Sequence, residues 1–77
     1  MNNPKLSIEL SKNEALVFFE FLTRFNQKDW PEIFEDQAEQ RVLWDIEAIL
    51  EKELVEPFKP DYEEIIKQAR ETIRDKK

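Results

Sequence analysis

The feature that most constrains the fold of this chain is the helical periodicity of its middle segment, residues 35–54. At 100° per residue, the apolar side chains of this segment gather on one side of a helix, so another element has to cover them. The positions that form this apolar face are Ala38, Val42, Leu43, Ile46, Ile49, Leu50 and Leu54. Pro57 and Pro60 bracket a break after the segment, because proline is excluded from helix interiors. The pattern predicts one amphipathic helix over residues 35–54.

Two further segments show helix signals. Ser11 and Glu14 have the spacing of a capping box, which predicts a helix over residues 12–26. The apolar face of that helix covers about 160° of its circumference, which is wide enough to contact two neighbours. Pro60 suits the first turn of a third helix over residues 60–75. Its apolar stripe consists of Tyr62, Ile65, Ile66, Ala69 and Ile73.

These segments predict a mainly α fold: a compact three-helix domain with a short extended N-terminal segment and the middle helix as its hub. A chain of 77 residues forms one domain, and we expect residues 1–5 and 75–77 to be frayed. Residues 5–10 alternate polar and apolar side chains, as in a strand. This segment either pairs with residues 54–58 or lies as an extended arm over the helices. The aromatic connection at residues 26–34 should fold back onto the bundle.

The composition removes most catalytic chemistry. The chain has no histidine, cysteine or glycine, which excludes Ser-His and Cys-His nucleophiles and all glycine-dependent phosphate-binding loops. The carboxylate pairs Glu35/Glu39 and Glu47/Glu51 have helical i,i+4 spacing, but a hard cation needs more oxygen ligands than such a pair supplies. We therefore expect a protein that is not an enzyme and that uses no cofactor and no metal.

The net charge of −6 is concentrated in the middle of the chain. Residues 29–56 hold ten acidic and two basic side chains, a balance of −8. This charge disfavours direct nucleic-acid binding and favours a basic partner. The alternative explanation is that the acidic surface only keeps the domain soluble. The sequence has no signal-peptide pattern and no apolar run long enough to span a membrane, so we expect a cytoplasmic protein without membrane contact.

Trp44 lies away from the apolar face of the middle helix, on a side that is otherwise polar. A large ring in that position needs a cover, either the 26–34 connection or the third helix, or another molecule. We favour internal burial slightly, and we keep the interface as the alternative because tryptophan is enriched at binding hot spots. The predicted contact residues for a partner are Trp44, Gln40, Arg41, Ala48, Glu47 and Glu51.

Three strings along residues 6–72 resemble a group of short uncharacterised bacterial proteins. The strings are EALVFFEFL at residues 14–22, AEQRVLW at 38–44 and LVEPFKPDY at 54–62. The resemblance implies a bacterial source and a small stand-alone domain, and it carries no activity or site residue.

We therefore expect a non-enzymatic, acidic protein-binding module, such as an antitoxin- or immunity-like inhibitor or a regulatory adaptor. One alternative is a homodimer that completes its core across a two-fold axis. Another is an acidic nucleic-acid mimic that occupies the groove of a basic protein, which predicts binding that weakens with salt.

Overall fold

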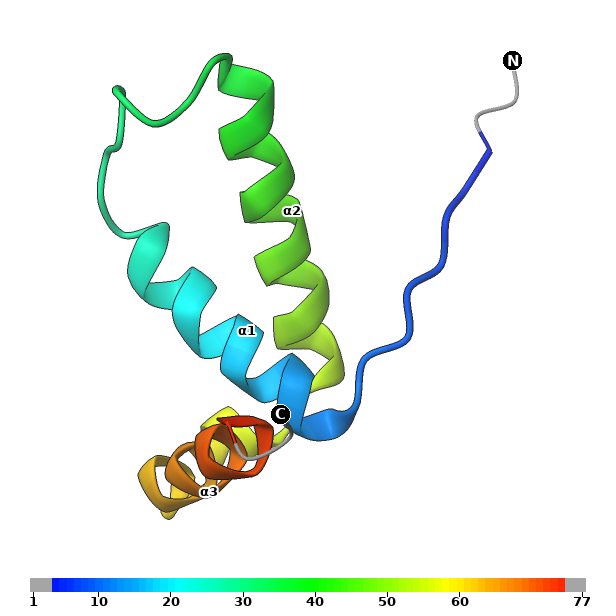
Figure 1. Ribbon diagram of the computed structural model, residues 1–77, viewed down its shortest axis with the longest axis vertical. Helices are drawn as coiled ribbons and strands as arrows, with labels where there is room; N and C mark the ends of the chain where they lie inside the picture. Colours follow the sequence, from blue (N-terminus) through cyan, green and yellow to red (C-terminus); the bar gives the residue numbers. More distant parts are fainter. Residues whose placement is uncertain (1–3, 75–77) are drawn as a thin grey trace.

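The computed structural model describes residues 4–74 and contains three α-helices and one short 3₁₀-helix (Figure 1). Helix α1 spans Lys12–Phe25, α2 spans Gln37–Glu53, η1 spans Glu56–Phe58 and α3 spans Tyr62–Arg74. No β-strand occurs among residues 4–74, so the predicted mainly α, three-helix fold is confirmed. Of the ends that were expected to fray, residues 1–3 and 75–77 lie outside the described part, and Pro4 and Lys5 are exposed.

Helix α1 begins at the predicted capping box. The Ser11 hydroxyl accepts a hydrogen bond from the Glu14 amide at 3.0 Å, and the Glu14 carboxylate accepts one from the Ser11 amide at 2.8 Å. Lys12, in the first turn, forms an ion pair with Glu56 of η1 at 3.1 Å. The start of α1 is therefore fixed both by its own cap and by a contact with a segment far along the chain.

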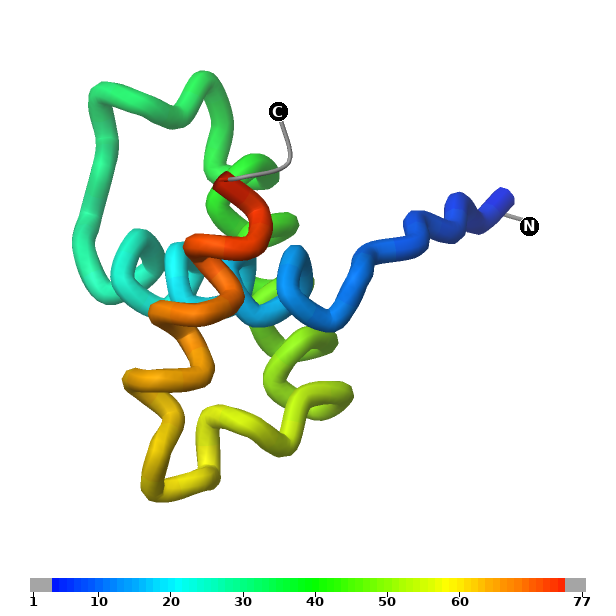
Figure 2. The backbone as a smooth tube through the Cα atoms, turned by 60° about the horizontal axis from the view of Figure 1, so that its bottom comes forward, coloured from blue at the N-terminus to red at the C-terminus, as the bar shows by residue number. Residues whose placement is uncertain are grey.

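The hub of the fold is α1, because it packs against both α2 and α3. The expectation that the middle helix holds this place is wrong, and the wide apolar face of α1 is the reason. Figure 2 shows α1 between the other two helices, with α3 crossing it. Three of the seven buried core residues come from α1; the seven are Leu16, Phe19, Leu22, Leu50, Leu54, Ile66 and Ala69.

Helix α2 uses only part of its apolar face. Leu50 is buried, and Leu43 and Ile46 pack partly against the core. Val42 is 52% exposed and Ile49 is 59% exposed, although the sequence pattern placed both on the core side. Helix α3 packs on α1, and both side chains on this flank of α2 keep more than half of their surface in solvent.

Residues 4–10, called the arm below, carry no regular secondary structure and project away from the helices (Figures 1 and 2). Leu6 is 94% exposed and Ile8 is 82% exposed. Both predicted arrangements of this segment, a strand paired with residues 54–58 and an arm lying over the helices, are therefore wrong. Its apolar side chains are left in contact with solvent.

The connection between α1 and α2 folds back partly, as expected. The Trp30 ring stacks on Phe25 with 5.2 Å between ring centroids, and its indole N–H donates to the Phe25 carbonyl at 2.7 Å. Phe34 contacts the Phe25 ring edge-on, with 6.1 Å between ring centroids, whereas Ile33 remains exposed.

No residue from 4 to 74 adopts a positive φ angle, so the turns of this glycine-free chain use ordinary backbone conformations.

Candidate protein-interaction surface

The position of Trp44 is set by where α2 begins. The Asp36 carboxylate accepts a hydrogen bond from the Ala38 amide at 2.7 Å, which caps the helix at its N-terminus. The Glu39 carboxylate accepts a further bond from the Glu35 amide at 2.9 Å. From this start, helical spacing places Gln37, Arg41, Trp44 and Ala48 along one flank, called the Trp44 stripe below.

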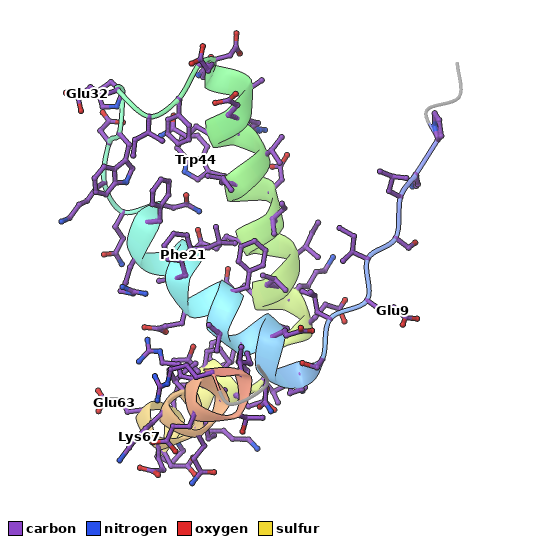
Figure 3. All side chains as sticks on the ribbon, viewed as in Figure 1. Glu9, Phe21, Glu32, Trp44, Glu63 and Lys67 are labelled. Carbon is purple, nitrogen blue, oxygen red and sulfur yellow. The ribbon has the colours of Figure 1, made fainter. Side chains whose placement is uncertain are left out.

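Trp44 is 41% exposed and is not part of the core. The favoured expectation of internal burial is therefore wrong. The two predicted covers are occupied elsewhere: α3 packs on α1, and Trp30 and Phe34 of the connection pack on Phe25. Figure 3 shows the side chain on α2. Trp44 and its neighbours line a shallow hollow of about 350 Å³, formed by Asp36, Gln37, Ala38, Arg41 and Trp44.

The other predicted contact residues divide into two groups. Arg41, Ala48 and Glu51 are exposed on the same side of α2 as Trp44, and Gln40 is half-buried. Arg41 reaches Asp45 at 3.6 Å in an ion pair between two exposed side chains. Such a surface pair contributes little to stability. Arg41 can therefore exchange this partner for one on another molecule at small cost.

Glu47 already has a role within the fold. Its carboxylate accepts a hydrogen bond from the Asn26 side-chain amide at 2.7 Å, and the same amide group lies 3.4 Å from the Leu43 carbonyl. Asn26 is the C-cap of α1, so these bonds join the end of α1 to the middle of α2. Glu47 therefore joins the two helices. Among the predicted contact residues Glu51 is the exposed carboxylate on this side of α2, and the Asp36 carboxylate beside Trp44 caps the helix.

A second apolar surface, not predicted from the sequence, lies on the flank of α2 opposite the Trp44 stripe. Ala38, Val42 and Ile49, called the Val42 stripe below, are all exposed. Val42 and Trp44 are two residues apart, which places them about 160° apart around the helix. Helical periodicity placed the Val42 stripe in the core, because periodicity shows which side chains share a face of the helix. It does not show how much of that face the neighbouring helix buries.

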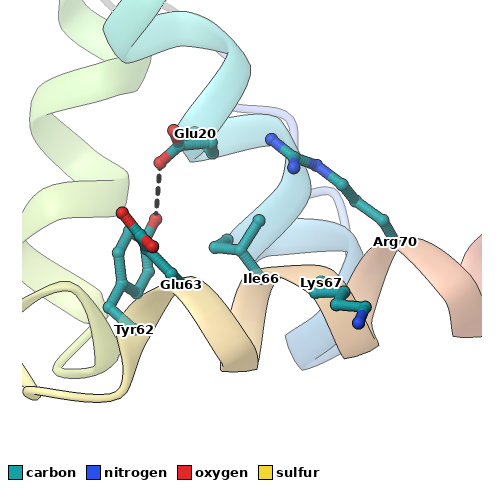
Figure 4. Close-up of a pocket in the computed structure, with 6 residues that line it drawn as sticks. All are labelled: Glu20, Tyr62, Glu63, Ile66, Lys67 and Arg70. Carbon is teal, nitrogen blue, oxygen red and sulfur yellow. Dashed lines mark hydrogen bonds between the residues drawn. The ribbon is translucent and has the colours of Figure 1, made fainter.

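A second feature lies between α1 and α3. The Tyr62 hydroxyl donates a hydrogen bond to the Glu20 carboxylate at 3.0 Å (Figure 4). Burial, followed by this bond and the charge of Glu20, raises the pKa of Tyr62 above its ordinary value of 10.0. The hollow beside this pair has a volume of about 510 Å³ and is lined by Glu20, Tyr62, Glu63, Ile66, Lys67 and Arg70. Two acidic and two basic side chains balance there, and the protonated tyrosine serves as a clamp between the helices.

Aromatic side chains also gather at the end of α1. Phe21 stacks on Phe25 with 5.5 Å between centroids, and Phe25 in turn holds Trp30. The Arg24 guanidinium lies 5.9 Å from the Phe21 ring, and the Lys28 ammonium lies 5.9 Å from the Trp30 ring. The Lys28 ammonium beside the Trp30 ring favours the folded position of the connection, whereas Arg24 and Phe21 both lie on α1. The i,i+4 spacing of Phe21 and Phe25 was the sequence signal for this cluster.

Within the described residues, no group of three or more histidine, cysteine, aspartate or glutamate side chains is placed to hold a metal ion. None of the helices in this part of the chain combines the length and the apolar character needed to cross a bilayer. No match to the chain was found among protein-family models, curated proteins or solved structures.

Proposed function

We propose that this chain is a non-enzymatic protein-binding module of the cytoplasm, and that the Trp44 stripe is its contact surface. The observation that carries the proposal is the half-exposed Trp44 ring, which borders a hollow on α2, a helix in which only Leu50 is buried. Exposed tryptophan in such a position supplies a large, rigid contact area at small entropic cost. An inhibitor of antitoxin or immunity type, or a small regulatory adaptor, fits this description.

The charge around the stripe indicates the chemistry of the partner. Asp36 and Glu51 lie near Trp44, and residues 29–56 as a whole carry a balance of −8. A basic surface with an apolar pocket for the indole would complement this arrangement. Charged groups at the rim of such an interface accelerate association, while the buried ring determines how slowly the complex dissociates.

The test is affinity capture of a bacterial lysate with the wild-type chain, Trp44→Ala and Phe58→Ala, followed by quantification of each bound protein. Phe58 is the matched control, because it is an exposed aromatic residue on η1, outside the stripe. We expect at least one partner to be lost with Trp44→Ala and retained with Phe58→Ala. Circular dichroism must show that both variants keep the wild-type helix content. Equal recovery of all proteins by the two variants contradicts the proposal.

The acidic surface also supports a second candidate, a mimic of nucleic acid that blocks a basic protein. The two functions differ in their response to salt. A mimic depends on many charge pairs, so its affinity falls steeply between low and high ionic strength. A contact centred on Trp44 keeps most of its affinity, because burial of apolar surface is not screened. The dissociation constant of the captured pair, measured across a salt series, separates the two.

A further inference from the structure

The arm carries apolar side chains that nothing in its own molecule covers. Leu6 and Ile8 are almost fully exposed, and Leu10 is exposed as well. Alternation places these three on one side of an extended segment, whereas Ser7 and Glu9 lie on the other. The arm therefore presents one apolar edge and one polar edge, which suits a segment that lies against a surface.

The direction of the arm is determined by the cap of α1. The reciprocal hydrogen bonds between Ser11 and Glu14 fix the backbone at the point where the arm leaves the helix. The Lys12–Glu56 ion pair holds the first turn of α1 against η1. With this junction fixed, the arm points away from the three helices (Figure 2).

The same chain carries a surface that fits the apolar edge. The three side chains of the Val42 stripe are exposed along α2, Val42 by 52% and Ile49 by 59%. Val42 and Ile49 are separated by seven residues, or about 10 Å along the helix. Leu6 and Leu10 are separated by about 13 Å in an extended segment. The apolar edge of the arm is thus long enough to cover the exposed part of the stripe.

We propose that two copies of this chain associate by exchanging arms, with the arm of each copy lying on the Val42 stripe of the other. Exchange about a two-fold axis satisfies both surfaces of both copies at once, because each contact is repeated by symmetry. This inference concerns the opposite flank of α2 from the Trp44 stripe, and it does not depend on the proposed binding function.

The area available is close to what a stable dimer needs. The four large side chains that are more than half exposed, Leu6, Ile8, Val42 and Ile49, each carry on the order of 100 Å² of apolar surface. Together they supply roughly 400 Å² per chain, which corresponds to about 700 Å² per partner at the usual apolar share of an interface. Specific interfaces bury about 800 Å² per partner. The exchanged arms therefore account for most of the contact without any further surface.

The test is sedimentation analysis of the whole chain over a range of concentrations up to high micromolar. We expect a monomer–dimer equilibrium for the wild type. The arm variant Leu6→Glu/Ile8→Glu and the stripe variant Val42→Lys/Ile49→Lys should each be monomeric, with dissociation constants raised at least tenfold. Ser7→Glu is the matched control, since it places the same charge on the polar edge of the arm and should dimerise as the wild type does. All five substitutions are at exposed positions, and circular dichroism must show that each variant folds.

Mixing the two double variants decides between arm exchange and any other dimer. A mixed dimer contains one intact contact, formed by the wild-type arm of the stripe variant on the wild-type stripe of the arm variant. Its second contact pairs glutamates with lysines. We expect the mixture to dimerise where neither variant does alone. A dimer in which the arms pair with each other gives no rescue, because one arm remains altered, and this result would overturn the proposal.

A wild-type chain that stays monomeric at high micromolar concentration also overturns the proposal. In that case the arm either remains in solvent or covers the stripe of its own molecule. The outcome is separate from that of the Trp44→Ala capture experiment. Ala38 borders both surfaces, but no variant in either experiment changes it.

Discussion

Helices α1 and α2 are alike in sequence character and differ in how the fold uses them. Both are amphipathic, with 14 and 17 residues, and both begin at a side-chain cap. Helix α1 has neighbours on two sides and contributes Leu16, Phe19 and Leu22 to the core, whereas within α2 only Leu50 is buried. The comparison shows that the apolar face of a helix indicates how much of its surface needs to be buried. Which helices pack against each other then decides whether the same chain buries that surface.

The difference has a consequence for function. Leu16, Phe19 and Leu22 of α1 are buried, so substitutions at these positions act on stability, and Phe21 is the large apolar residue of this helix that stays exposed. A helix covered on one side keeps apolar residues that another molecule can bury, and their substitutions act on association. The two proposed surfaces, the Trp44 stripe and the Val42 stripe, both lie on α2 for this reason.

The largest expected effect comes from shortening one apolar side chain in each of the two helices. Leu22 is fully buried in α1, so Leu22→Ala should lower the free energy of unfolding by about 2–5 kcal/mol. Ile49→Ala in α2 should change it by less than about 0.5 kcal/mol in the monomer, because that side chain is largely in water. Urea unfolding, followed by circular dichroism at a concentration where the wild type is monomeric, measures both. Equal losses would show that α2 is covered as fully as α1.

A smaller effect is expected at the junction of the two helices. Asn26→Ala removes the hydrogen bond to the Glu47 carboxylate and should destabilise the fold by about 1–2 kcal/mol. Gln27→Ala, at the neighbouring exposed position, is the control and should leave the unfolding midpoint in place. If Asn26→Ala has no effect, the orientation of α2 is set by core packing alone.

The smallest effect concerns the contact of α1 with α3 and depends on pH. The pKa of Tyr62 is raised in the folded chain, so above its ordinary value of 10.0 the unfolded chain loses the proton first. The contribution of Tyr62 is therefore complete below that pH and is lost as the pH rises further. We expect the wild type to lose more stability than Tyr62→Phe between about pH 9 and about pH 11. Parallel pH profiles for the two proteins would show that Glu20 does not hold the hydroxyl.

The sequence predicted the local features of this fold well. Capping at Ser11 and Glu14, and the prolines around η1, are determined by neighbours within a few residues, and the helix bounds agree with the structure to within two residues. The fold-back of Trp30 was predictable for the same reason, since its partner Phe25 lies five residues away.

The order of packing was not predictable in this way. The wide apolar face of α1 showed that this helix can contact two neighbours, but periodicity does not show which helix α3 contacts. The exposure of Val42 and Ile49 and the partial exposure of Trp44 follow from that contact, whereas the direction of the arm follows from the cap of α1. The Trp44 stripe was predictable, because Trp44 is a large apolar ring on an otherwise polar side of the helix. The Val42 stripe was not, because its residues belong to the apolar face that the pattern assigned to the core.

The turns of this chain are built without glycine, and this has a consequence for its stability that contacts alone do not reveal. Glycine gives an unfolded chain its widest range of conformations, and proline restricts that range. A chain with no glycine and four prolines therefore begins folding from a narrower ensemble and loses less conformational entropy on the way. A domain with seven buried core residues among residues 4–74 is thus stabilised in part by the stiffness of its own denatured state.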